Sequence, residues 1–160
     1  MIFVTIGSMF PFDRLIRAMD AWTAKRGRDD VFAQIGNGSY EPAHMKWTRR
    51  LDQTMFTETV QSAVLIVAHA GMGSVITAQE FGKPIVLLPR IEAWGEHTTD
   101  HQIATTNWLR SKPGIYVADT DDDLDLKIRE ALEANQNSFE KLTRTAPPDF
   151  VARIRAAILE

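Results

Sequence analysis

The chain has 160 residues, 44% hydrophobic and 24% charged, which is enough for one globular domain with a sizeable core. Its formal net charge of −3 gives no electrostatic reason to expect nucleic acid as a partner, and the lack of cysteine excludes disulfides and thiolate chemistry. We expect no signal peptide and no membrane span, because no apolar run approaches the roughly 20 residues that cross a bilayer.

Short apolar runs alternate with helical patterns along the chain. Strands are expected at residues 2–6, 31–35, 55–56, 64–68, 85–88 and 115–117. Helices are expected at residues 11–19, 58–63, 75–81, 98–110, 121–132 and 150–159. Residues 39–53 show no clear period and are expected to form a loop with a short helix. This alternation is typical of an α/β fold, here a single doubly wound, Rossmann-like domain with a mostly parallel sheet.

A proline-containing, linker-like stretch lies near the C-terminus. We therefore divide the chain into a domain at residues 1–142 and a linker with a C-terminal helix at residues 143–160. The apolar face of that helix lies beyond the linker, so it either docks on a partner or packs on its own domain.

The most informative stretch is the glycine turn in which the apolar run 64–68 ends, at His69, Gly71, Gly73 and Ser74. Strand, glycine turn and helix in this order place free backbone N–H groups and a helix N-terminus at the carboxyl end of a parallel strand. Open α/β folds bind phosphate-bearing ligands there. Ser74 is the expected helix N-cap. The turn is not a P-loop, so an ordinary β–α turn without a ligand is the competing interpretation.

Three loops are expected to meet at the carboxyl edge of the sheet, and together they would form a ligand crevice. One contains Gly7 and Ser8, the second is the glycine turn, and the third is the polar stretch at residues 95–102. In that stretch the carboxylate of Asp100 and the amide of Gln102 suit the vicinal hydroxyls of a sugar. A solvated helix start is the alternative.

Four residues with ionisable side chains are also considered for the site. Glu80 would accept hydrogen bonds from both hydroxyls of a ribose, or it is an ordinary surface glutamate. His69 would contact phosphate or transfer a proton, or it is a structural histidine. His97 and His101 lie four residues apart, as metal ligands can, but no third ligand is evident nearby, so we expect no metal.

These motifs together resemble the C-terminal half of family 28 glycosyltransferases of the GT-B fold. The resemblance rests on Ile6-Gly7-Ser8, His69-Ala70-Gly71-Met72-Gly73-Ser74, Glu80 with Gly82-Lys83-Pro84, and Glu96-His97 with Asp100-His101-Gln102. It covers roughly residues 2–135 and is closest to free-standing halves. These include small subunits of bacterial exopolysaccharide and capsule glucuronosyltransferases, and the small subunit of the eukaryotic enzyme that adds the second N-acetylglucosamine to the dolichol-linked precursor.

The resemblance implies a UDP-sugar as the donor, with no metal and no other cofactor. By position, Gly71, Met72, Gly73 and Ser74 would hold the diphosphate with Gly7 and Ser8 near it, Glu80 would bind the ribose, and Asp100, His101 and Gln102 would face the donor sugar. His69 and His101 are the candidate proton-transfer groups. Arg90 would approach a sugar carboxylate if the donor is UDP-glucuronate.

A complete GT-B enzyme has two Rossmann-like domains, and the acceptor site and usually the catalytic base lie on the other one. The resemblance therefore implies a subunit of an inverting glycosyltransferase of surface-polysaccharide synthesis, inactive without a membrane-associated partner. The partner would bind the lipid-linked acceptor and keep the otherwise cytoplasmic chain at the inner face of the membrane. Without it the chain would be free to self-associate. The alternatives are a non-catalytic regulatory module of a partner transferase and a homodimeric UDP-sugar epimerase fragment.

Overall fold

Short strands alternate with helices throughout the computed structural model, which describes residues 1–134, 146 and 148–159. The strands are β1 (Ile2–Thr5), β2 (Val31–Gln34), β3 (Lys46–Thr48), β4 (Leu65–His69), β5 (Ile85–Leu88) and β6 (Ile115–Val117). The helices are α1 (Asp13–Arg26), α2 (Gln53–Ser62), α3 (Met72–Glu80), α4 (His101–Leu109), α5 (Leu124–Glu133) and α6 (Pro148–Leu159). Two short 3₁₀ turns, η1 (Glu92–Trp94) and η2 (Asp121–Asp123), complete the set.

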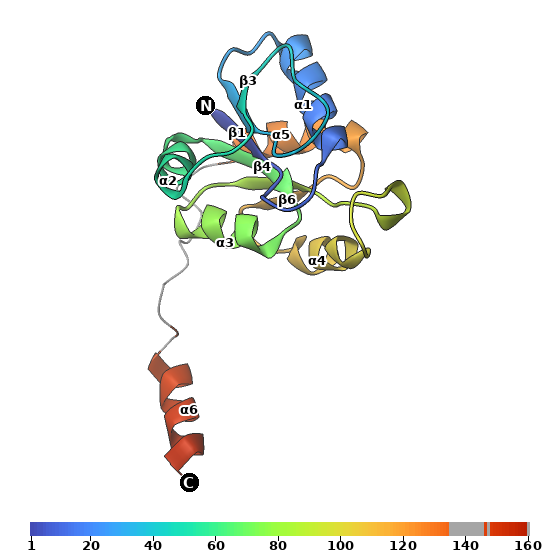
Figure 1. Cartoon of the computed structure of the whole chain (residues 1–160). Helices are drawn as coiled ribbons and strands as arrows, with labels where there is room; N and C mark the ends of the chain where they lie inside the picture. The colour runs from blue at the N-terminus through green and yellow to red at the C-terminus, as the bar shows by residue number, and fades with distance from the viewer. Residues whose placement is uncertain (135–145, 147, 160) are drawn as a thin grey trace.

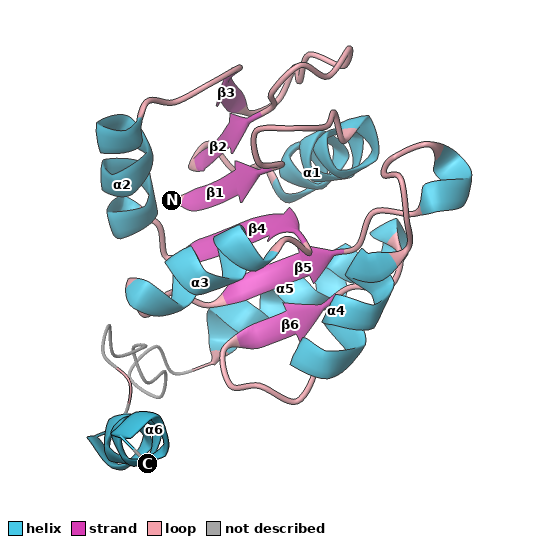
Figure 2. Ribbon diagram, turned by 60° about the horizontal axis from the view of Figure 1, so that its bottom comes forward, coloured by secondary structure: helices cyan, strands magenta, loops and turns pink. Residues whose placement is uncertain are grey.

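The six strands form one sheet in the order β3-β2-β1-β4-β5-β6, and all neighbouring strands are parallel (Figure 2). This is the strand order of the doubly wound dinucleotide-binding fold, so the predicted fold class is confirmed. The direction of winding reverses between β1 and β4, which pair from Ile2 with Leu65 to Thr5 with Ala68. Ligands of such sheets bind outside the carboxyl ends of the strands at this switch point.

Helices cover both faces of the sheet and bury its central strands, whereas the edge strand β3 is partly exposed (Figure 2). On one face Val4 packs in a cluster with residues of α1 and α5, and on the other Phe3 packs in a cluster with residues of α2, α3 and α4. Because the central strands are buried on both sides, they are continuous apolar runs rather than alternating ones. These two layers hold the ends of β1 and β4 in fixed positions.

Two stretches differ from the sequence prediction in the type of secondary structure, apart from shifts in where predicted helices begin and end. Residues 46–48 form the edge strand β3, which pairs only with β2 and is too short to show a recognisable pattern. Met55 and Phe56 lie in α2 and not in a strand. The reason is that the Asp52 side chain accepts the backbone N–H of Met55 at 2.8 Å and caps a helix that begins at Gln53.

The C-terminal helix α6 lies away from the domain, and all of its side chains are exposed (Figure 1). Its apolar residues Phe150, Ile154 and Ile158 are among them. The predicted domain boundary at residues 142–143 lies outside the described residues. In the described part of the chain, no helix is long and apolar enough to cross a membrane.

Candidate functional site

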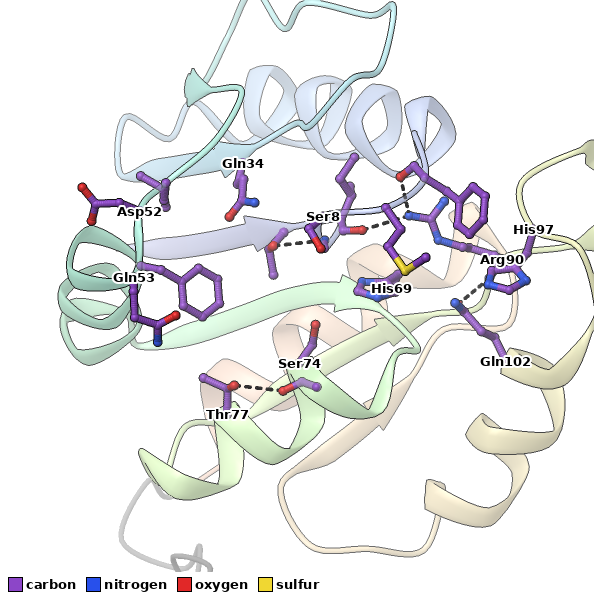
Figure 3. A pocket seen from close by; sticks show the side chains of 18 residues that line it. Ser8, Gln34, Asp52, Gln53, His69, Ser74, Thr77, Arg90, His97 and Gln102 are labelled. Carbon is purple, nitrogen blue, oxygen red and sulfur yellow. Dashed lines mark hydrogen bonds between the residues drawn. The ribbon is translucent and has the colours of Figure 1, made fainter.

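A cavity of about 450 Å³ opens at the carboxyl edge of the sheet, over the switch point between β1 and β4 (Figure 3). The loop after β1 and the first two turns of α3 form its central part. The N-terminus of α2 and Gln34 lie at one end, and Arg90, His97 and Gln102 lie at the other. The three loops expected to meet at this edge therefore do so.

The glycine turn leads directly into α3, whose first residue is Met72 and whose N-cap is Gly71. Ser74 is thus inside the helix, and the prediction that it is the N-cap is wrong; no side chain caps this end. The N–H groups of Ser74 and Val75 donate to the carbonyl of Gly71. The N–H groups of Met72 and Gly73, which come before them in the first turn, have no acceptor within α3. Gly73 and Ser74 line the cavity, so these donors and the positive end of the helix dipole are offered to an anion.

The imidazole of His69 lies between two of the glycines. A Cβ on Gly71 would lie 2.3 Å from Nε2 of His69, and a Cβ on Gly7 would lie 2.8 Å from its Cε1. A Cβ on Gly73 would meet nothing within 4 Å. Gly7 and Gly71 therefore make room for the histidine ring, while Gly73 is the position that leaves open space for a ligand.

His69 is neutral near pH 7. Burial and, to a smaller extent, the charge of Arg90 lower its pKa to about 4, and the backbone of Thr5 only partly opposes them. Its Nδ1 is buried and has no hydrogen-bond partner among the described residues. A neutral imidazole brings no positive charge to a phosphate, and with this pKa it is a weak base.

Arg90 is a buried cation, 2% exposed, that binds the main chain of two loops. Its Nη2 donates to the carbonyls of Ile6 at 2.9 Å and Phe10 at 2.8 Å. Its Nη1 donates to those of Pro11 at 2.5 Å and Glu96 at 3.2 Å. Burial lowers the pKa of Arg90 to about 10, so the guanidinium stays charged at neutral pH. Because both terminal nitrogens bind carbonyls, Arg90 shapes the cavity wall, which corrects the expectation that it meets a sugar carboxylate.

Gln102 joins the ends of two strands. Its side chain is 3% exposed, and Oε1 accepts the backbone N–H groups of Ala70 at 3.2 Å and Arg90 at 3.1 Å. Its amide nitrogen makes no hydrogen bond with the described residues. Since the oxygen is already used, Gln102 can offer a ligand in the cavity only a donor.

Two other candidate residues of the polar stretch, Asp100 and His101, lie outside the cavity lining. Asp100 accepts the backbone N–H of Glu92 at 2.8 Å, and Nδ1 of His101 lies 2.6 Å from Oγ1 of Thr99. The ring of His101 packs edge-on against His97, with centroids 4.4 Å apart, and His97 does line the cavity. Across the described ranges, no cluster of three or more His, Asp or Glu side chains is placed to hold a metal ion.

Along α3 the cavity reaches Thr77 but not Glu80. Thr77 lines the cavity and donates its hydroxyl to the carbonyl of Gly73 at 2.9 Å. Glu80 is the last residue of α3, about 10 Å from Gly73 along the helix axis, and Met72 at its start is exposed and also outside the lining. Thr77 was missed in the sequence, although its i, i+4 relation to Gly73 places both on one helix face.

The end of the cavity near α2 was also missed. Gln34, Leu51, Asp52, Gln53 and Phe56 line it. The sequence prediction treated residues 51–56 as loop and strand, and a glutamine at the end of a strand carries no motif. The sequence does contain one indication of this end of the cavity. Asp52 is a residue type that caps helices, and α2 begins directly after it, beside the sheet edge.

Comparisons with known proteins agree with this fold. The model of the glycosyltransferase family 28 C-terminal domain matches residues 1–154, whereas a comparison with curated protein sequences gives no match. Among solved structures, the kitacinnamycin glycosyltransferase matches with a TM-score of 0.62 and 17% identity, over 83% of this chain and 35% of that one. Glycosyltransferase VinC, solved in complex with dTDP, matches with a TM-score of 0.54 and 17% identity, over 99% and 42%.

The structure of ALG13 matches with a TM-score of 0.60 and 14% identity, and covers 96% of this chain and 93% of ALG13. At these identities the structural matches establish a shared fold. The chain spans less than half the length of the kitacinnamycin enzyme and of VinC, but nearly all of ALG13. The family match extends over almost the whole chain, and we conclude that the chain belongs to the glycosyltransferase family 28 C-terminal domain family.

Proposed function

We propose that the chain is the donor-binding subunit of an inverting, UDP-sugar-dependent glycosyltransferase of surface-polysaccharide synthesis. The observation that carries the proposal is the cavity at the switch point, with the open N-terminus of α3 on one side. The family match supports a sugar transferase, and the VinC complex with dTDP supports a nucleoside diphosphate as the ligand of this fold.

The diphosphate would lie against the start of α3, on the backbone N–H groups near Gly73 and the hydroxyl of Ser74. Gly7 and Ser8 line the same cavity from the opposite loop. In glycosyl transfer with inversion, the acceptor oxygen attacks the anomeric carbon and the bond to UDP breaks. Negative charge then develops on the leaving diphosphate, where fixed backbone donors and a helix dipole stabilise it.

The donor sugar would lie at the end of the cavity formed by His97 and Gln102, where the amide nitrogen of Gln102 donates to a sugar hydroxyl. Asp100 and His101 would contact the parts of the sugar that extend beyond the cavity. A base with a pKa of about 4 is poorly matched to deprotonating a hydroxyl near pH 7, which argues against His69 in that role. We therefore assign the catalytic base to the partner. Of the two histidines considered on this chain, His101 is the one that remains a candidate should the partner lack such a base.

The partner would be a membrane-associated protein that binds a lipid-linked acceptor and brings this chain to the inner face of the membrane. Large exposed apolar side chains support a partner surface next to the site: Met9 on the loop after β1 and Trp94 in η1. The apolar side chains of α6 offer a second contact. Without a partner, these surfaces would favour self-association.

Calorimetric titration of the purified chain with UDP, UDP-glucose, UDP-glucuronate and UDP-N-acetylglucosamine tests the proposal. We expect UDP to bind and one UDP-sugar to bind more tightly, which names the donor. Glu80→Ala and Thr77→Ala test which side chain holds the ribose. If none of the four ligands binds at millimolar concentration, the proposal fails.

A second experiment separates a catalytic subunit from a regulatory module. In the complex reconstituted with its partner, Gln102→Ala is expected to lower sugar transfer, and so is whichever of Glu80→Ala and Thr77→Ala weakens UDP binding. If transfer survives both changes although the chain binds UDP, the chain is a non-catalytic nucleotide-binding regulator. Sugar turnover by the isolated chain would instead indicate a self-sufficient enzyme.

A further inference from the structure

Gln34 is a buried polar side chain with an unused acceptor. It ends β2, is 7% exposed, and lines the cavity at the end opposite Gln102 (Figure 3). Its Oε1 is buried and accepts no hydrogen bond from any described residue. A buried oxygen without a donor lowers stability, so its presence here calls for a reason.

The strand order places Gln34 relative to the rest of the site. Along the sheet edge β2 is followed by β1, β4 and β5, with neighbouring strands about 4.8 Å apart. Gln34 therefore lies two strands from His69 and the glycine turn, and three strands from Arg90. A ligand whose diphosphate lies at the start of α3 and whose sugar lies at Gln102 extends its nucleoside toward Gln34.

The surroundings of Gln34 suit a nucleoside. Leu51 and Phe56 give this end of the cavity apolar walls, which fit a flat ring or the carbon face of a ribose. Asp52 accepts the N–H of Met55 through Oδ1 as the cap of α2, and the side chains of Asp52 and Gln53 are exposed, so water can satisfy their remaining oxygens. Gln34 is distinguished at this end by an acceptor that is buried and has no partner among the described residues.

We propose that Gln34 is a specificity-determining residue whose Oε1 accepts a hydrogen bond from an N–H or O–H group of the donor's nucleoside. The inference rests on the proposed function, because it places a nucleoside diphosphate in the cavity. In UDP the donors on the nucleoside are the N3–H of uracil and the 2′ and 3′ hydroxyls of ribose. Each of the three is a neutral donor, so each would make the same kind of hydrogen bond to Oε1 of Gln34.

Gln34→Met tests this role, because methionine has a similar volume but accepts no strong hydrogen bond. Without ligand, the variant is expected to unfold at the same temperature as the wild type or higher, since it removes an unsatisfied buried oxygen. For UDP its affinity is expected to fall about five- to tenfold, the effect of one lost neutral hydrogen bond. Gln61→Met, on an exposed side chain of α2 outside the cavity, is the matched control and should change neither value.

Three analogues identify the group that Gln34 binds: 3-methyl-UDP, 2′-deoxy-UDP and 3′-deoxy-UDP. Wild type should lose affinity for the analogue that lacks the bound donor, and Gln34→Met should bind that analogue and UDP equally well. The inference is overturned if Gln34→Met binds UDP as tightly as wild type, if it loses stability together with affinity, or if it discriminates among the analogues as wild type does. If wild type does not bind UDP at all, the proposed function fails and this inference with it.

Discussion

Two glycines in the turn after β4 predict opposite responses to alanine. At Gly71 a Cβ would lie 2.3 Å from Nε2 of His69, and the ring cannot move away freely because Gly7 also lies close to it. The backbone of Gly71, with φ −89° and ψ 135°, suits alanine, so the contact with the ring sets the cost. At Gly73, inside α3, a Cβ would meet nothing within 4 Å.

We expect Gly71→Ala to lower the free energy of unfolding by about 1–3 kcal/mol, the usual range for overpacking a buried contact. Gly73→Ala should raise it by about 0.5–1 kcal/mol, because alanine restricts the unfolded chain and favours the helix. Urea denaturation at pH 7 measures both values. Gly73→Ala should also weaken UDP binding, because its methyl group enters the space left for the diphosphate.

A double-mutant cycle with His69→Ala isolates the contact. In that background the ring is absent, and Gly71→Ala should cost less than about 0.5 kcal/mol, within the additivity error of such cycles. The reasoning is refuted if Gly71→Ala costs the same with and without the ring, or if Gly73→Ala destabilises the chain as much as Gly71→Ala does.

Three more variants or conditions test the rest of the structure. Arg90→Lys should cost about 2–4 kcal/mol in urea denaturation, since an ammonium cannot replace a planar fork that binds four carbonyls, and a loss below 1 kcal/mol would contradict this role. The folded pKa of His69, about 4, lies below its ordinary 6.5, so between these pH values the unfolded chain binds more protons. Stability should therefore fall by about 3 kcal/mol from pH 7 to pH 4, and an NMR titration of His69 with a midpoint near 6.5 would contradict it. Deleting residues 146–160 should leave the unfolding free energy unchanged, because α6 is exposed; a clear loss would mean that this helix packs on the domain.

The sequence was most informative where apolar runs end in glycine or proline. β5 and β6 have the bounds predicted for them, because Gly82-Lys83-Pro84 and Pro113-Gly114 delimit short runs that are buried on both faces. β3 could not be predicted from pattern, since three residues at a sheet edge show no period. The start of α3 was misplaced because the glycine at the N-cap makes no side-chain bond, whereas Ser74 looked like a typical cap.

Chain order also indicated much of the cavity lining. Gly7, Ser8, His69, Gly73 and Gln102 follow strands that end at one edge, and the structure brings them together. The sequence does not show which hydrogen bonds the polar atoms around the cavity make. That depends on tertiary contacts: Gln102 accepts two backbone donors from neighbouring strand ends, and Arg90 binds the carbonyl of Phe10, 80 residues before it. For the same reason the unused oxygen of Gln34 is apparent only in the folded chain.

Amide NMR of the labelled chain during a UDP titration shows whether the cavity at the carboxyl edge binds a nucleoside diphosphate. We expect saturable shifts of the backbone amides of Gly73 and Ser74 and of the side-chain amide of Gln34, with little change in α5, none of whose residues lines the cavity. No shifts at millimolar UDP, or shifts confined to residues outside this edge of the sheet, would contradict it.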